Sequence, residues 1–95
     1  MITFYDYLDV INCNLDIKRY HNQNERWMAM IENAEVRTGT AGLLGTYGSG
    51  KSSDEAIQDY LKIIKGQLLI INAMSKEYRR EFTVPENIIF KEMKS

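Results

Sequence analysis

Residues 45–71 read GTYGSGKSSDEAIQDYLKIIKGQLLII, and this stretch decides the fold because a glycine-rich turn, a helix and a strand follow one another directly. Apolar side chains recur in it at the spacing of one helix face: Ala56, Ile57, Tyr60, Leu61 and Ile64. Gly66 ends this helix as a C-terminal cap. The apolar run from Gln67 to Met74 then predicts a strand that is covered on both faces.

Two further strands are expected before this stretch and one after it. Residues 27–37 alternate between two faces, and a period of two predicts a strand. A turn at residues 38–40 and a second strand at residues 41–47 complete a hairpin, because a short connection makes neighbouring strands antiparallel. Residues 78–84 alternate in the same way, and Pro85 closes this fourth strand.

The two ends of the chain add a helix and a tail. Thr3 followed by Asp6 resembles a capping box, and the apolar spacing after it predicts a helix from Thr3 to Cys13. Residues 14–26 are polar without a periodic apolar face, so we expect a connecting loop. The tail, residues 86–95, carries Ile88, Ile89 and Phe90, which dock either on the body or on another chain.

The order of these elements predicts a single α+β domain over residues 1–95. Residues 1–26 hold the N-terminal helix and the polar loop. Residues 27–85 form a β-β-α-β-β core with a four-stranded sheet and one helix packed across it, and residues 86–95 form the tail. The central helix is long enough for a right-handed parallel crossover between the second and third strands.

Composition and charge exclude several classes of protein. A net charge of −1 provides no field that would hold a nucleic acid backbone, so nucleic acid is not expected as a partner. The single cysteine, Cys13, cannot close an internal disulfide, and no secretory signal is recognisable, so we expect a cytoplasmic protein. No apolar run approaches the roughly 20 residues that a membrane span requires.

Residues 45–52 match the phosphate-loop pattern G-x-x-x-x-G-K-[ST], which makes Gly45, Gly50, Lys51 and Ser52 candidates for nucleotide binding. Three features argue against a nucleotide. The chain is too short for the parallel sheet that carries such loops. The apolar strand ends at Asn72, where a magnesium ligand would be an Asp.

The third feature is the first turn of the helix, where Asp54 and Glu55 already complement the positive end of the helix dipole and would repel a triphosphate. Ser52 with Glu55 three residues later also forms a capping box. Gly48 and Gly50 then supply permissive backbone for a sharp turn. We therefore predict that the motif is a turn and a cap, and we expect no cofactor.

The other polar candidates suggest contact surfaces rather than chemistry. Cys13 and His21 do not match a metal-ligand spacing, so we expect neither a metal site nor a catalytic residue. Aspartates on the polar side of the N-terminal helix and a basic cluster beside an aromatic side chain could face a partner. An RNA-binding sheet would also place cations beside aromatic side chains. The residues considered for contact are Tyr5, Asp6, Asp9, His21, Lys76, Tyr78, Arg79 and Arg80.

The segments GSGKSSDEAIQDY, residues 48–60, and RREFTVP, residues 79–85, resemble a family of small proteins encoded by phages and prophages of Gram-positive bacteria. Two strands, a Ser-x-x-Glu-Ala helix and a strand are also similar, more remotely, to the HicB-type antitoxin domain, whose DNA-binding extension this chain lacks. The resemblance implies a non-enzymatic protein that occupies a host bacterial protein, such as a component of a CRISPR defence system. The alternatives are a nucleotide or nucleic-acid binder and a phage structural protein, and the fourth strand could pair across a homodimer axis.

Overall fold

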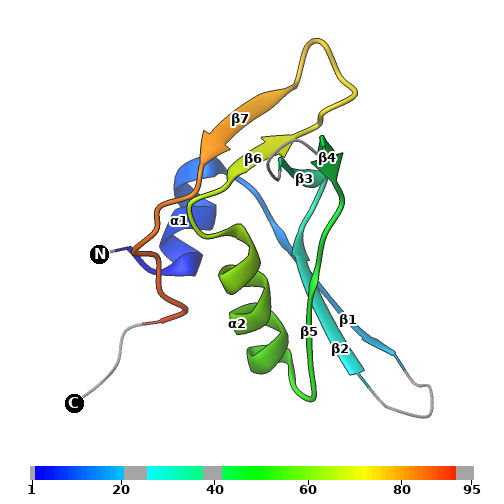
Figure 1. The fold of residues 1–95 in the computed structure, drawn as a ribbon, viewed down its shortest axis with the longest axis vertical. Helices are drawn as coiled ribbons and strands as arrows, with labels where there is room; N and C mark the ends of the chain where they lie inside the picture. The colour runs from blue at the N-terminus through cyan, green and yellow to red at the C-terminus, as the bar shows by residue number, and fades with distance from the viewer. Residues whose placement is uncertain (1, 21–25, 38–41, 92–95) are drawn as a thin grey trace.

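Two helices and seven strands make up the fold, in a computed structural model that describes residues 2–20, 26–37 and 42–91 (Figure 1). In chain order they are α1 Phe4–Ile11, β1 Leu15–Tyr20, β2 Arg26–Ile31, β3 Ala34–Arg37, β4 Leu43–Leu44, β5 Gly48–Gly50, α2 Ser53–Ile64, β6 Leu68–Ile71 and β7 Arg80–Thr83. The expected α+β class is confirmed.

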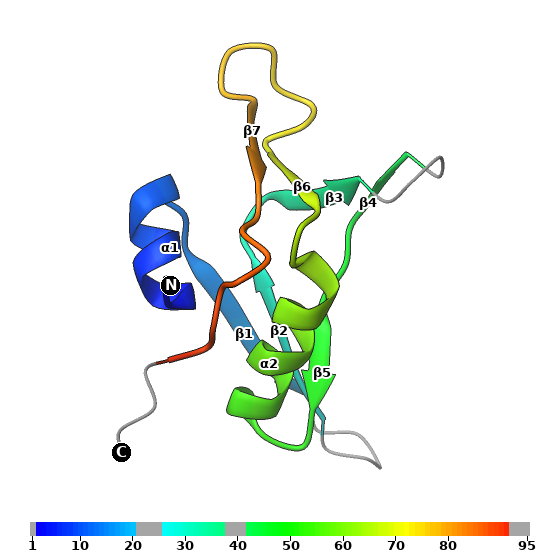
Figure 2. The same cartoon turned by 60° about the vertical axis from the view of Figure 1, so that its left-hand side comes forward.

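The strands form two antiparallel sheets rather than one. The four-stranded sheet, in the order β4-β3-β6-β7, draws one strand from each of the four expected regions. A three-stranded sheet, in the order β1-β2-β5, accompanies it, and α2 packs on β5 and β2 of that sheet (Figure 2). The expected parallel crossover is wrong, because β6 pairs with β3 and every strand pair is antiparallel.

The expected strand at residues 27–37 is broken in the middle. Asn33 has a φ of 60°, a left-handed conformation that asparagine tolerates better than most residues, and it turns the chain between β2 and β3. The alternation of buried residues shifts by one position at Asn33, from Ala29 and Ile31 to Ala34 and Val36, because each half contributes to a different sheet with its own buried face.

Of the expected strand at residues 41–47, only Leu43–Leu44 among the described residues forms a strand, β4. The sharp turn expected at Gly48 and Gly50 is wrong, because Gly48–Gly50 forms the strand β5, which pairs with β2.

The polar segment at residues 14–26 was expected to be a loop, and this prediction is wrong for Leu15–Tyr20, which forms β1. This strand pairs with β2 from Leu15 opposite Ile31 to Tyr20 opposite Arg26. Its last four residues are exposed, so the strand carries little of the apolar signal from which strands are recognised. Pairing with the apolar β2 determines its conformation.

Both helices begin where the capping residues predict. The hydroxyl of Thr3 accepts a hydrogen bond from the amide of Asp6 at 3.2 Å, and the hydroxyl of Ser52 accepts one from the amide of Glu55 at 3.1 Å. Gly66, directly after the C-cap Lys65, has a φ of 70°. The glycine therefore ends α2 as predicted from its conformational freedom.

The C-terminal segment docks on the body of the molecule. The amide of Phe4 donates a hydrogen bond to the carbonyl oxygen of Ile89 at 2.7 Å, and Ile88 is fully buried beside α1 and α2 in the core. Of the two alternatives for this segment, the contact with the body is thus observed. None of the described helices is long and apolar enough to cross a membrane.

Candidate functional site

The glycine-rich segment is a strand that packs against a helix. A Cβ atom at Gly48 would overlap the carbonyl oxygen of Ala56 and the amide nitrogen of Tyr60. A Cβ atom at Gly50 would lie 2.9 Å from the amide nitrogen of Ala56. Both positions lie in β5, opposite Ala29 and Trp27 of β2, so their glycines allow β5 to approach α2 closely.

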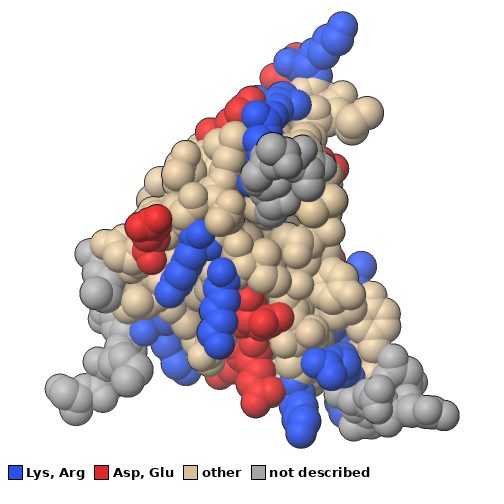
Figure 3. Space-filling view, viewed as in Figure 1, with Lys and Arg blue, Asp and Glu red and all other residues tan. Residues whose placement is uncertain are grey.

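The backbone amides of this segment already have acidic partners. The amide of Ser49 donates to Oδ2 of Asp59 at 2.9 Å, and the amide of Lys51 donates to Oε2 of Glu55 at 2.8 Å. In a phosphate loop these N–H groups would face phosphate oxygens. Here carboxylates of α2 take that place, and Figure 3 shows acidic side chains flanked by basic ones on this face. Gly45 lies apart from them, exposed between β4 and β5.

This geometry predicts that ATP and GTP do not bind. Lys51 is exposed and Ser52 is the helix cap, so Lys51→Ala should change the free energy of unfolding by less than about 0.5 kcal/mol. Glu55→Ala, the matched change within the same segment, should cost about 1 kcal/mol because Glu55 closes the capping arrangement. Titration with fluorescent nucleotide and denaturant unfolding measure both effects. Saturable, magnesium-dependent binding that Lys51→Ala abolishes would contradict the prediction.

The connection between β6 and β7, residues 72–79, is hereafter called the β6–β7 loop. It extends from the end of the molecule in both ribbon views (Figures 1 and 2). Three of its own side chains form hydrogen bonds within it. The amide group of Asn72 donates to the carbonyl oxygen of Tyr78 at 3.3 Å, the hydroxyl of Ser75 accepts from the amide of Tyr78 at 3.0 Å, and Nη1 of Arg79 donates to the carbonyl oxygen of Ala73 at 3.2 Å. The loop is therefore internally braced.

Large side chains project from this braced backbone into solvent. Met74 is 95% exposed and Tyr78 is 64% exposed, and Lys76 and Glu77 beside them are exposed as well. Exposed apolar side chains on a structured backbone are typical of contact surfaces, because little conformational entropy is lost when they bind. Methionine, tyrosine and arginine are also enriched in protein interfaces.

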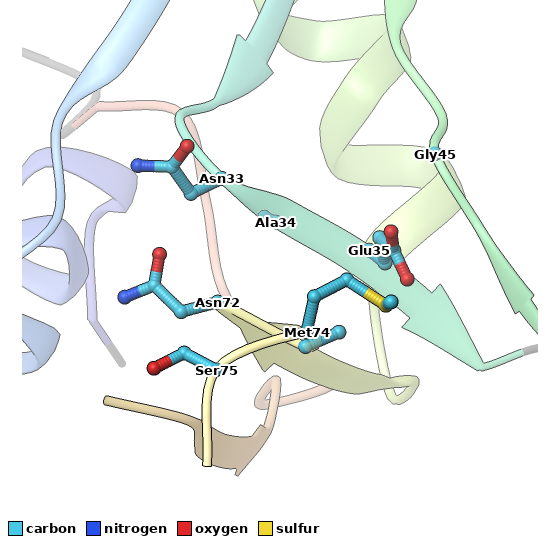
Figure 4. A pocket seen from close by; sticks show the side chains of 8 residues that line it. Asn33, Ala34, Glu35, Gly45, Asn72, Met74 and Ser75 are labelled. Carbon is cyan, nitrogen blue, oxygen red and sulfur yellow. The ribbon is translucent and has the colours of Figure 1, made fainter. Parts of the chain in front are cut away.

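A shallow cavity of about 510 Å³ adjoins the loop (Figure 4). Asn72, Met74 and Ser75 line it from the loop, and Asn33 and Glu35 line it from the opposite side. The lining combines amide, hydroxyl and carboxylate groups with one flexible thioether side chain. A surface of this composition is suited to contact with a partner side chain.

The expected basic cluster does not form one surface. Lys76 projects into solvent, whereas Nε of Arg79 lies 3.3 Å from Oε2 of Glu81, in addition to its bond within the loop. Arg80 turns toward the body, where its Nη1 donates to the carbonyl oxygen of Ile11 at 2.6 Å. Of the four candidates in this region, Lys76 and Tyr78 are therefore available to a partner, Arg79 braces the loop and Arg80 holds α1.

Arg80 connects β7 to the C-terminal end of α1. Its guanidinium lies 5.4 Å from the ring centre of Phe82, and its Nη2 is 3.4 Å from Sγ of Cys13. Burial raises the pKa of the Cys13 thiol, and the neighbouring Arg80 opposes this increase. A cation at a helix C-terminus is favourable, because the last carbonyl groups there carry partial negative charge.

We expect Arg80→Met to destabilise the protein by about 2 kcal/mol, because the carbonyl oxygen of Ile11 loses a charged donor while the aliphatic packing is kept. Denaturant unfolding measures this difference. Arg79→Met, a matched change at the neighbouring exposed position, should cost less than about 1 kcal/mol. Equal losses at the two positions would contradict the role assigned to Arg80.

The candidates near the N-terminus lie on a separate surface. Tyr5, Asp6 and Asp9 are exposed on α1, and the ring of Tyr5 packs 5.9 Å from the ring of Phe90. His21 lies outside the described residues. Within the described ranges, no group of His, Cys, Asp and Glu side chains is arranged to hold a metal ion.

Met74 is the exposed residue that the sequence analysis assigned wrongly. It was placed at the end of a covered strand, but β6 ends at Ile71 and Asn72 turns the chain with a φ of 53°. The signal was the asparagine, which tolerates this left-handed conformation and commonly ends a strand.

Comparison with protein-family models, curated proteins and solved structures finds no match to the chain.

Proposed function

We propose that this chain is a non-enzymatic protein that binds and inhibits a host bacterial protein, and that the β6–β7 loop is its main contact surface. The observation that supports this function most strongly is the exposure of Met74 and Tyr78 on a loop braced by its own hydrogen bonds. Exposing these apolar side chains to water is unfavourable in the free protein. Burying them against a partner removes that cost and requires little ordering of the loop.

The expected class of partner follows from the resemblance to small phage and prophage proteins. Proteins of this kind commonly act by occupying a host protein, and a component of a bacterial defence system, including a CRISPR effector, is the target that we propose. The charges on the loop suit a protein surface, because Lys76, Glu77 and the ion-paired Arg79 are of mixed sign. A polyanionic backbone would instead favour a patch of one sign.

Affinity capture from Gram-positive host cells tests this function. Immobilised wild-type protein should retain one host protein in stoichiometric amount, and the retention should persist when the salt concentration is raised. The alternative function, nucleotide or nucleic-acid binding through residues 45–52 and the basic cluster, predicts a salt-sensitive shift of a labelled oligonucleotide. That shift, in the absence of any stoichiometric host protein, would overturn the proposal.

A further inference from the structure

Over the described residues, the three-stranded sheet has one edge whose outward amides bond to α2 and one edge, β1, that pairs with no further strand. At the β5 edge, the amide of Ser49 is taken by Asp59 and the amide of Lys51 by Glu55. The opposite edge is β1, six residues long and outermost in the order β1-β2-β5 (Figure 1). An open strand of this length is a template for pairing with another strand.

The hydrogen-bond pattern determines which residues of β1 face the open edge. The amide of Glu32 donates to the carbonyl oxygen of Asn14 at 2.9 Å, so the backbone of Asn14 faces β2. Backbone groups alternate along an antiparallel strand. The backbone N–H and C=O groups of Asp16 and Lys18 therefore also face β2, whereas those of Ile17 point outward. The same alternation continues through β2 to β5, where it predicts that the amide of Ser49 points away from β2. This amide indeed donates to Asp59 of α2.

Charge then favours one register for a second copy among the three with an axis at Asp16, Ile17 or Lys18. A two-fold axis perpendicular to the sheet lies midway between one residue and the same residue of the second copy, because directly opposed residues must lie on the same face. An axis at Asp16 places two carboxylates opposite each other, and an axis at Lys18 places two ammonium groups opposite each other. An axis at Ile17 places Asp16 opposite Lys18 twice, with Ile17 opposite its own copy.

We propose that the chain forms a symmetric dimer by antiparallel pairing of β1 with β1 of a second copy, centred on Ile17. Lysine on an edge strand normally discourages pairing. In this strand Nζ of Lys18 already lies 3.5 Å from Oδ2 of Asp16, so the edge presents both signs on one face. Ile17 is 38% exposed, and pairing would bury its side chain against its copy. The two three-stranded sheets would then join into one.

Sedimentation of the purified chain from about 1 to about 300 μM tests the proposal, since pairing through one short strand is expected to give a weak to moderate dimer. The mass should rise with concentration from 11.1 kDa to twice that value. Ile17→Pro should remain monomeric at every concentration. Its fold should be kept, because the amide that proline lacks points away from β2 and proline is tolerated at such edge positions.

Charge variants test the register independently of proline. Asp16→Lys and Lys18→Asp should each weaken dimerisation by at least about 10-fold, since each places like charges opposite each other. The double variant Asp16→Lys/Lys18→Asp restores both opposite-charge pairs and should dimerise like the wild type. Circular dichroism shows whether each variant is folded. If Ile17→Pro does not fold, the three charge variants alone test whether the chain dimerises through β1. A monomeric wild type, or a double variant that stays as weak as the singles, would overturn the proposal.

Discussion

Replacing Gly48 with alanine is expected to lower the free energy of unfolding by about 3 kcal/mol or more, the largest stability loss that we anticipate from the addition of one methyl group. The added Cβ would overlap backbone atoms of Ala56 and Tyr60, which cannot move without displacing α2. For a domain of this size the midpoint of thermal unfolding should fall by roughly 12 °C or more. Thermal and denaturant unfolding at one fixed protein concentration measure the loss.

Gly45→Ala is the matched control for this prediction. Apart from its chain neighbours, no atom of the described residues lies within 4 Å of a Cβ added at Gly45, and its φ is not in the left-handed region. We expect a change below about 1 kcal/mol, in the stabilising direction, because alanine restricts the unfolded chain. If residues 45–52 were a phosphate loop, Gly45 would be the essential first glycine of the motif. A large loss at Gly45 with little loss at Gly48 would therefore contradict the packing described for β5.

The double variant Met74→Ser/Tyr78→Ser should weaken binding to the captured host protein by about 100-fold or more. Each side chain is largely exposed in the free protein, and a buried anchor of this kind typically contributes about 2 kcal/mol to an interface. The free energy of unfolding should change by less than about 0.5 kcal/mol, because neither side chain belongs to the core. Calorimetric titration with the captured protein measures the affinity.

Val10→Ser/Tyr47→Ser is the control for this change, since it removes one aliphatic and one aromatic side chain that are also exposed, at 74% and 50%. These residues lie on α1 and before β5, outside the β6–β7 loop. Their loss should leave the affinity within about 3-fold of the wild-type value, as is typical of positions outside an interface. Equal losses of affinity in the two double variants would count against the loop as the contact surface.

Local signals in the sequence predicted much of the fold. The Ser52–Glu55 capping box, the stripe of α2 and Gly66 place a helix correctly because each acts within one or two turns of the chain. The four regions expected to form strands do form the four-stranded sheet. These features depend on neighbours in sequence, which a single chain displays.

The remaining features depend on contacts between distant segments. β1 becomes a strand because β2 pairs with it, although its own side chains are mostly exposed. The break at Asn33 separates two sheets, and the sheet that each half joins is determined by its partner strands, β1 and β5 for β2, and β4 and β6 for β3. Arg80 was expected at a contact surface together with its basic neighbours, but the carbonyl oxygen of Ile11, far away in sequence, turns it inward. Such a partner cannot be identified from local sequence.

Site-specific photocrosslinking in host cells tests the central claim most directly. A photoreactive amino acid replaces Tyr78 in one variant and Tyr47 in another, and both variants are expressed and irradiated under the same conditions. We predict one crosslinked host protein from position 78 and none from position 47, with the same protein recovered by affinity capture. A host protein crosslinked from position 47 and not from position 78 would contradict it.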